Sequence, residues 1–130
     1  MAKILIAAAE ARMLDYLVQG LAEAGHEIHT AISIDKVLDL LAEERFDLVV
    51  SDIFQPVLDS IALFKTIARS TPKTRVIALL DFNTERAKHY DLSVWVDSAV
   101  SKPFTSGRVR NEIDFVLAAA SRRAPAPELV

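Results

Sequence analysis

The amino-acid sequence predicts an α/β fold, a five-stranded doubly wound parallel sheet with helices on both faces. Apolar runs of strand length alternate with segments of helix length, and this pair occurs five times along the chain. Parallel strands need a crossover connection, which is usually a helix, so the alternation favours a parallel sheet covered on both sides. The 130 residues, 52% of them hydrophobic, match the size and composition of one compact domain.

The first two strand–helix pairs are read from hydrophobic periodicity. The run KILIA (3–7) predicts a buried strand, and apolar residues at i, i+3, i+4 and i+7 predict a helix over 14–21. Gly25 suits the position just after that helix, where left-handed backbone is common. The alternating EIHTA (27–31) predicts the second strand, and the helical spacing returns over 34–41.

The third pair and the fourth strand contain the most apolar runs of the chain. FDLVVSD (46–52) is a continuous apolar run that ends in an acid, which is typical of a central parallel strand. Apolar residues over 61–67 predict the third helix, and RVIALL (75–80) predicts the fourth strand.

The last part of the chain is more polar. TERAKHYD (84–91) predicts a short polar helix, VWVDSAVS (94–101) the fifth strand region, and the apolar spacing over 109–120 the last helix. Two prolines then change the composition, because proline cannot continue a helix. We therefore expect one domain over 1–120 and a flexible C-terminal tail over 121–130.

Composition excludes several classes of function. A net charge of −3 gives no general attraction to nucleic acid or anionic lipid, and no apolar run is long enough for a membrane span. The chain has no cysteine, which excludes disulfides and thiolate metal sites and fits a cytoplasmic protein. Three glycines cannot build a phosphate-cradling loop. Side chains alternate along a strand, so His26 and His29 should lie on opposite faces and not share a metal.

Ligands of open α/β sheets bind beyond the carboxyl ends of the strands, and an aspartate and a lysine converge on that edge here. Asp52 ends the third strand and Lys102 follows the fifth. Such an aspartate can accept a phosphoryl group as an acyl phosphate, and the lysine can hold a phosphoryl oxygen as a point charge. Equally, Asp52 could be a cap or turn residue that forms a salt bridge with Lys102. Spacing alone leaves both interpretations open.

The order of elements and two motifs resemble the receiver domain of two-component response regulators. The motifs are DLVVSDIFQPVLDS (47–60) and VSKPF (100–104), and the resemblance covers residues 3 to about 120. It implies a flavodoxin-like topology with strand order 2-1-3-4-5. Its phosphoacceptor pattern, D-x-x-M-P-x-x-D-G, is matched by Asp52, Pro56 and Asp59, whereas the methionine and glycine positions hold Gln55 and Ser60.

The resemblance makes Asp52 the phosphoacceptor candidate and Lys102 the phosphoryl-contacting candidate, with a cis peptide bond before Pro103. Proline is the residue that tolerates such a bond. The family's acidic pair after the first strand, which holds Mg²⁺ together with the phosphoacceptor, corresponds to Ala8 and Ala9.

Methyl groups offer no oxygen ligand to Mg²⁺. The remaining metal ligands implied by the resemblance are Asp52 and the backbone carbonyl of Phe54, with Glu10 as a weak third. Glu10 is one residue out of register and is expected to begin the helix, where a carboxylate favours the helix dipole. We expect no cofactor, or weakly bound Mg²⁺.

Two more positions of the resemblance are apolar. Leu80 stands at the family's Thr/Ser position after the fourth strand, and leucine cannot donate a hydrogen bond. Ala99 stands at the family's Tyr/Phe switch, and alanine has no rotamer to change. Ala8, Ala9, Leu80 and Ala99 together make the site degenerate.

We therefore expect a non-enzymatic, receiver-like signalling protein that acts by binding a protein partner, with a degenerate and Mg-poor site. The partner would be a histidine kinase, a phosphotransferase or a downstream adaptor target. The alternative is a conventional receiver phosphorylated on Asp52, and a third class is a flavodoxin-like small-molecule binder. Trp95 is either an exposed anchor for a partner or partly buried core.

Overall fold

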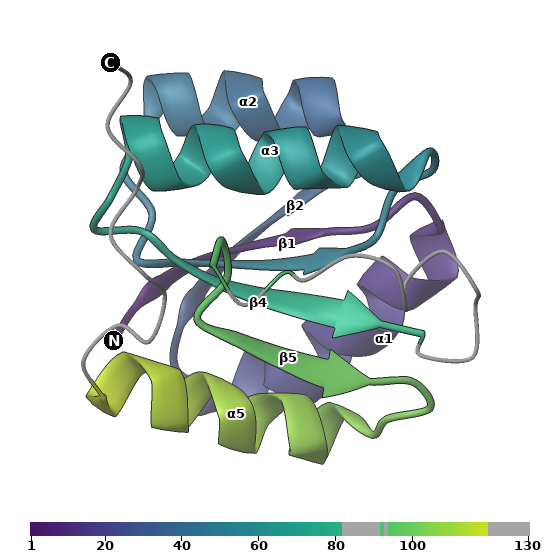
Figure 1. Ribbon diagram of the computed structural model, residues 1–130. Helices are drawn as coiled ribbons and strands as arrows, with labels where there is room; N and C mark the ends of the chain where they lie inside the picture. Colours follow the sequence, from purple (N-terminus) through teal and green to yellow (C-terminus); the bar gives the residue numbers. More distant parts are fainter. Residues whose placement is uncertain (82–91, 93, 120–130) are drawn as a thin grey trace.

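The computed structural model describes residues 1–81, 92 and 94–119 and contains the predicted five-stranded parallel sheet, ordered β2-β1-β3-β4-β5 (Figure 1). All four strand pairings are parallel. The strands are β1 (Lys3–Ala7), β2 (Glu27–Ala31), β3 (Leu48–Asp52), β4 (Arg75–Leu80) and β5 (Ser98–Ser101). The predicted fold class and strand order are thus confirmed.

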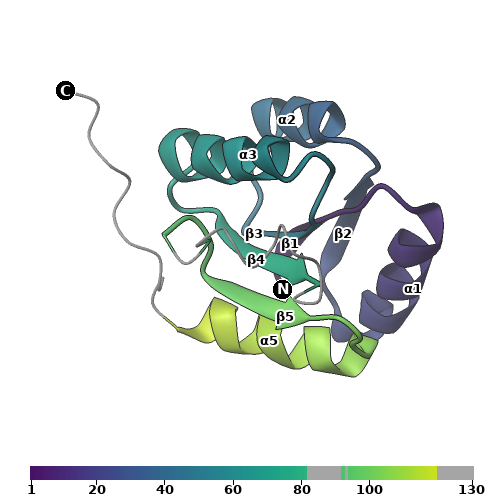
Figure 2. The ribbon, with the colours of Figure 1, turned by 45° about the vertical axis from the view of Figure 1, so that its right-hand side comes forward.

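Helices cover both faces of the sheet. Figures 1 and 2 show α2 and α3 on one face of it and α1 and α5 on the other. The helices are α1 (Ala11–Leu21), the short 3-10 helix η1 (Ala22–Ala24), α2 (Ile34–Glu43), α3 (Val57–Ser70) and α5 (Ser106–Ala118). No described helix has the length and hydropathy needed to cross a bilayer. The predicted helix at 84–91 and the predicted tail at 121–130 lie outside the described residues.

The core consists of two apolar clusters, one on each face of the sheet. Leu5 and Val49 face α2 and α3, whereas Ile4 and Val50 face α1 and α5, and all four side chains are fully buried. Strands buried on both sides need apolar residues at every position, which explains the continuous apolar runs of the sequence.

Several element ends differ by a few residues from the predicted ones: β3 begins at Leu48 rather than at 46, and α5 covers Ser106–Ala118 rather than 109–120. Gly25 adopts the left-handed backbone with φ 79°, as predicted. The fifth strand, however, includes only the last four residues of the predicted 94–101, so that prediction was too long. Trp95 and Val96 bond through their amides to the Leu92 carbonyl, which places them in a turn. The buried Asp97 carboxylate then accepts from the Val76 amide at the start of β4.

Helices α1 and α5 approach closely at Gly20. A Cβ built on Gly20 would lie 2.2 Å from Ser106 Cβ, whereas one built on Gly107 would have no neighbour nearer than 3.8 Å. Alanine is the better helix former at both positions. We expect Gly20→Ala to lower the free energy of unfolding by about 1–3 kcal/mol through overpacking. The matched Gly107→Ala should leave it unchanged or raise it by up to about 1 kcal/mol. Urea unfolding of both variants measures the difference, and equal effects would refute the close helix contact.

Candidate functional site

The carboxyl ends of the strands meet at one edge of the sheet, and Asp52 and Lys102 meet there too. Asp52 is the last residue of β3 and is 8% exposed. Lys102 follows β5, and its Nζ lies 2.7 Å from Asp52 Oδ1. The Ile53 amide donates to the same oxygen at 2.9 Å. The structure therefore brings together the two residues that the spacing placed on one edge, as a charge-assisted pair.

Backbone contacts fix this pair in place. The Lys102 amide donates to the Leu80 carbonyl at 2.7 Å, which extends the β4–β5 ladder by one step. The Lys102–Pro103 peptide bond is cis, as the resemblance implied. Asp52 has a short side chain on β3, a strand that lies between β1 and β4. Both charged groups are thus held by regular structure rather than by a long loop.

Ala8 and Ala9 follow β1 in two different environments. Ala8 is fully buried in the cluster that contains Leu14 and Leu17, and its amide donates to the Ala31 carbonyl at 3.1 Å. Ala9 is exposed at the start of the β1–α1 connection. Neither side chain carries an oxygen, so this connection offers no carboxylate at the two positions where the resemblance expects a pair.

Glu10 lies at the N-cap position of α1, where the sequence predicted that the helix begins. Its carbonyl accepts from the amides of Met13 at 3.1 Å and Leu14 at 3.3 Å, while its exposed side chain makes no capping hydrogen bond. The backbone carbonyl of Glu10 therefore accepts the first hydrogen bonds of α1.

The Phe54 carbonyl, the other expected metal ligand, lies against a buried hydroxyl. The Phe54 amide donates to Ser60 Oγ at 2.7 Å, and Ser60 Oγ donates in turn to the Phe54 carbonyl oxygen at 3.3 Å. Ser60 has no exposed surface. The serine at the family's glycine position therefore fastens the β3–α3 connection to α3, a contact that the sequence did not indicate.

The two other positions that differ from the family pattern, Leu80 and Ala99, lie in an apolar cluster. Leu80 is 6% exposed and belongs to the cluster beneath α2 and α3, and Ala99 packs against the same cluster. Trp95 also packs there while partly exposed, with Lys65 Nζ and the Arg69 guanidinium 5.4 and 5.7 Å from its ring centroid. The core interpretation of Trp95 agrees with this packing.

The oxygen donors at the expected ligand positions do not fit a magnesium site well. Mg²⁺ requires near-octahedral oxygen coordination and commonly uses carboxylates. Of the expected ligands, Asp52 and Phe54 supply oxygens that already have partners within the protein. The exposed carboxylate of Glu10, the weak third, makes no capping hydrogen bond and stands one residue out of the family's register. Ala8 and Ala9 supply none.

A charged cluster lies at the opposite edge of the sheet. Among the described residues, Glu27, His29 and Glu44 form the group whose ligand atoms lie within 4.8 Å of one another. The Lys3 ammonium lies 3.4 Å from Glu27 and donates a hydrogen bond to Glu44, so one cation already offsets part of the group's negative charge. The sequence did not reveal this cluster, because Glu44 follows α2 and reaches the β1–β2 pair only in the folded chain.

Glu27 makes part of the stability depend on pH. The hydrogen bond with His29, and to a lesser degree Lys3, lowers the pKa of Glu27 below its ordinary 4.5. A carboxyl with a lowered pKa contributes stability above its unfolded-state pKa and loses it as the pH falls through the folded value. We expect the free energy of unfolding to fall below pH 4.5, and Glu27→Gln to weaken that fall. Urea unfolding between pH 7 and pH 3 measures this loss of stability, and the exposed Glu43→Gln is the control. The same loss of stability at acid pH in Glu27→Gln as in the unmodified chain would refute the prediction.

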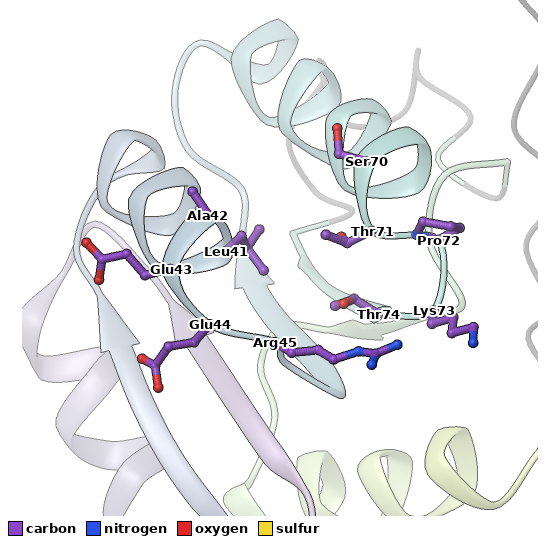
Figure 3. A pocket seen from close by; sticks show the side chains of 10 residues that line it. All are labelled: Leu41, Ala42, Glu43, Glu44, Arg45, Ser70, Thr71, Pro72, Lys73 and Thr74. Carbon is purple, nitrogen blue, oxygen red and sulfur yellow. The ribbon is translucent and has the colours of Figure 1, made fainter.

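Two surface hollows lie on the side of α2 and α3. The first, of about 460 Å³, lies between the C-terminal ends of the two helices (Figure 3), and none of its lining residues comes from the carboxyl end of β3, where Asp52 lies. Figure 3 shows Arg45 and Lys73 at its rim and Leu41 inside it. The second, of about 470 Å³, lies between the N-terminal ends of α2 and α3 and includes Phe54. Only the second adjoins the phosphoacceptor candidate.

Comparison with known proteins agrees with this geometry. The family model described as the response regulator receiver domain matches residues 4–114. The response regulator receiver protein CpdR of Brucella abortus is 31% identical over 121 residues, which are 92% of this chain and 100% of CpdR. The alkaline phosphatase synthesis transcriptional regulatory protein PhoP of Bacillus subtilis is 26% identical over 127 residues, and the match spans 98% of this chain but about half, 53%, of PhoP.

Solved structures show the same fold. TrrA of Thermotoga maritima, a response regulator solved in complex with Mg²⁺–BeF, superposes with a TM-score of 0.76 and 26% identity, over 89% of this chain and 99% of TrrA. Receiver domains are generally non-catalytic signalling domains and typically bind Mg²⁺ at the phosphorylation site. The chain belongs to the response regulator receiver family of two-component signalling.

Proposed function

We propose that this receiver domain signals through a protein partner, with a degenerate site that works largely without Mg²⁺ and without phosphate. The observation that carries this proposal is the pair Ala8 and Ala9, which leaves Asp52 and the out-of-register Glu10 as the side-chain oxygen donors among the expected ligands. Phosphoryl transfer depends on positioning and on neutralising charge, and the metal normally supplies both. Leu80 and Ala99 remove the hydroxyl and the ring through which a receiver would respond.

In this proposal the ion pair between Asp52 and Lys102 has a structural role. The 2.7 Å contact neutralises a nearly buried carboxylate at the carboxyl edge of the sheet. A receiver held in one state by such contacts presents a constant surface. Its signalling output then depends on the presence of the partner rather than on a conformational switch. We propose a cytoplasmic location, as expected from the sequence.

The hollow beside the site supports binding through this edge. Ile34, Leu38 and Leu63 line it with Phe54, and Ile32 at its border is 55% exposed. Polar residues line the rest of the hollow, namely Ser33, Asp35, Gln55, Asp59 and Thr66. An exposed apolar side chain beside a hollow of mixed apolar and polar lining is the kind of surface that protein partners bury. The partner class remains a histidine kinase, a phosphotransferase or a downstream adaptor target.

A conventional receiver phosphorylated on Asp52 is the second candidate function. The observation that favours it is that Asp52 and Lys102 occupy the positions and the spacing of a phosphoacceptor pair. In this alternative, phosphorylation would break the ion pair and transfer the lysine to a phosphoryl oxygen.

Labelling by acetyl phosphate separates the two functions. The protein and its Asp52→Asn variant are incubated with acetyl phosphate, with and without Mg²⁺, and their intact masses are compared. The degenerate site predicts no Mg²⁺-dependent gain of one phosphoryl group in the unmodified chain. A gain that saturates, requires Mg²⁺ and disappears in Asp52→Asn would establish the conventional receiver. A receiver with a reconstructed acidic pair serves as the positive control for the reagent.

A further inference from the structure

Ser60 is a buried polar residue that contacts Phe54, one of the expected metal ligands, but is not itself an expected ligand. It lies in the first turn of α3, has no exposed surface, and forms two hydrogen bonds to the main chain of Phe54. Phe54 is the residue whose carbonyl the family resemblance assigns to the metal. The Ser60 hydroxyl therefore contacts an expected metal ligand, the Phe54 carbonyl, through a hydrogen bond to the main chain.

The direction of the two hydrogen bonds is fixed by their donors. The Phe54 amide can only donate, so at 2.7 Å it uses a lone pair of Ser60 Oγ. The single hydroxyl proton of Ser60 then needs an acceptor, and the Phe54 carbonyl oxygen lies 3.3 Å away. A buried hydroxyl without an acceptor is costly, so the fold holds that carbonyl against α3.

We infer that Ser60 is a positioning residue that turns the Phe54 carbonyl toward α3 and so weakens metal binding beyond the loss of the acidic pair. This inference deepens the proposed function and rests on it. A glycine at position 60, as in the family pattern, has no side chain to hold the carbonyl. A carbonyl oxygen has two lone pairs, so the hydroxyl lowers metal affinity without abolishing it.

The size of the effect follows from the bond that must be weakened. The 3.3 Å contact is longer than an ordinary O–H···O hydrogen bond, so the lower part of the usual net range applies, roughly a 2- to 5-fold change in an equilibrium constant. In a chain with the reconstructed pair Ala8→Asp/Ala9→Asp, Ser60→Ala and Ser60→Gly should therefore raise Mg²⁺ affinity by about 2- to 5-fold. If the double replacement at positions 8 and 9 does not fold, Ala9→Asp alone provides the background.

Isothermal titration with Mg²⁺ measures the affinity, and urea unfolding of each chain shows that loss of a buried hydrogen bond has not unfolded it. Thr66→Ala is the matched control, because Thr66 Oγ1 also donates to a helix carbonyl, Ala62 at 2.9 Å, but is exposed. We expect Thr66→Ala to leave Mg²⁺ affinity unchanged. Unchanged or lower affinity in both Ser60 variants would overturn the inference.

Where Mg²⁺ binding is too weak to titrate, Mn²⁺ serves as the probe, because it prefers the same oxygen ligands. Paramagnetic broadening of the Phe54 amide resonance should then be stronger in Ser60→Ala than in its background, and equal or absent broadening in both would overturn the inference. Failure of the proposed function looks different, since the unmodified chain would itself bind Mg²⁺ at millimolar concentration. If the unmodified chain does not bind Mg²⁺ and the Ser60 variants do not change Mg²⁺ affinity, the inferred role of Ser60 is overturned while the proposed function stands.

Discussion

Ala9→Asp and Ala8→Asp/Ala9→Asp are expected to bind Mg²⁺ at about millimolar concentration and to gain acetyl phosphate labelling on Asp52 on the order of 100-fold or more. Ala9 is exposed and follows β1, whose carboxyl end lies beside that of β3, so we expect an aspartate there to reach an ion bound at Asp52 while its charge stays solvated. Added carboxylates restore the charge and the oxygen ligands that Mg²⁺ needs. Titration calorimetry and intact mass measure the two gains.

The two positions should behave differently without the metal. Ala8 is fully buried among leucines, so an aspartate there takes a carboxylate out of water and lowers stability until an ion compensates. Ala9→Asp alone is therefore the more direct variant. Ala11→Asp is the matched control, because it adds the same charge at the exposed first residue of α1. A folded Ala9→Asp chain with no more affinity for Mg²⁺ than Ala11→Asp would show that the missing pair is not what removes the metal.

Lys102→Met is expected to lower the free energy of unfolding by about 1–3 kcal/mol, since it leaves the Asp52 carboxylate nearly buried without its cation. The full cost of breaking a buried pair is larger, but the Lys102 side chain is 31% exposed and water screens part of the interaction. Urea unfolding at neutral pH measures the loss. Lys73→Met, at the rim of the first hollow, should cost far less.

A double-mutant cycle separates the pair from other effects of the substitution. Asp52→Asn removes the charge that Lys102 neutralises, so Lys102→Met should cost less in the Asp52→Asn background. Equal costs in both backgrounds would mean that the 2.7 Å contact contributes nothing to stability and that Lys102 is free for another role.

Much of the fold could be predicted from local pattern. β1, β3 and β4 are largely apolar runs, because strands buried on both faces carry apolar residues at successive positions, whereas β2 was read from its alternation. The pattern was misleading over 94–97, where Trp95 and Val96 read as a strand but bond in a turn to Leu92. Asp97 was the residue in the sequence that could have indicated a turn, because its carboxylate accepts a hydrogen bond from the Val76 amide at the start of β4.

The candidate site was only partly accessible from the sequence. The convergence of Asp52 and Lys102 followed from strand ends that must share an edge, and their contact confirms it. The Ser60 hydroxyl was not predicted, because its six-residue reach back to Phe54 depends on how α3 leaves the strand. The group formed by Glu27 and Glu44 joins two segments by tertiary packing alone, so no spacing in the sequence could reveal it.

The most direct measurement is a Mg²⁺ titration of the unmodified protein, followed through the amide resonances of Ala9, Asp52, Ile53 and Phe54 up to about 10 mM, a range in which carboxylate-rich Mg²⁺ sites fill. Because Ile53 donates to Asp52 and Phe54 donates to Ser60, an ion at the site must disturb these amides. We expect no saturable shift, with the same titration shifting them in Ala9→Asp. A saturable shift of all four resonances in the unmodified chain would contradict the degenerate, metal-independent site and favour the conventional receiver, in which Asp52 accepts phosphate.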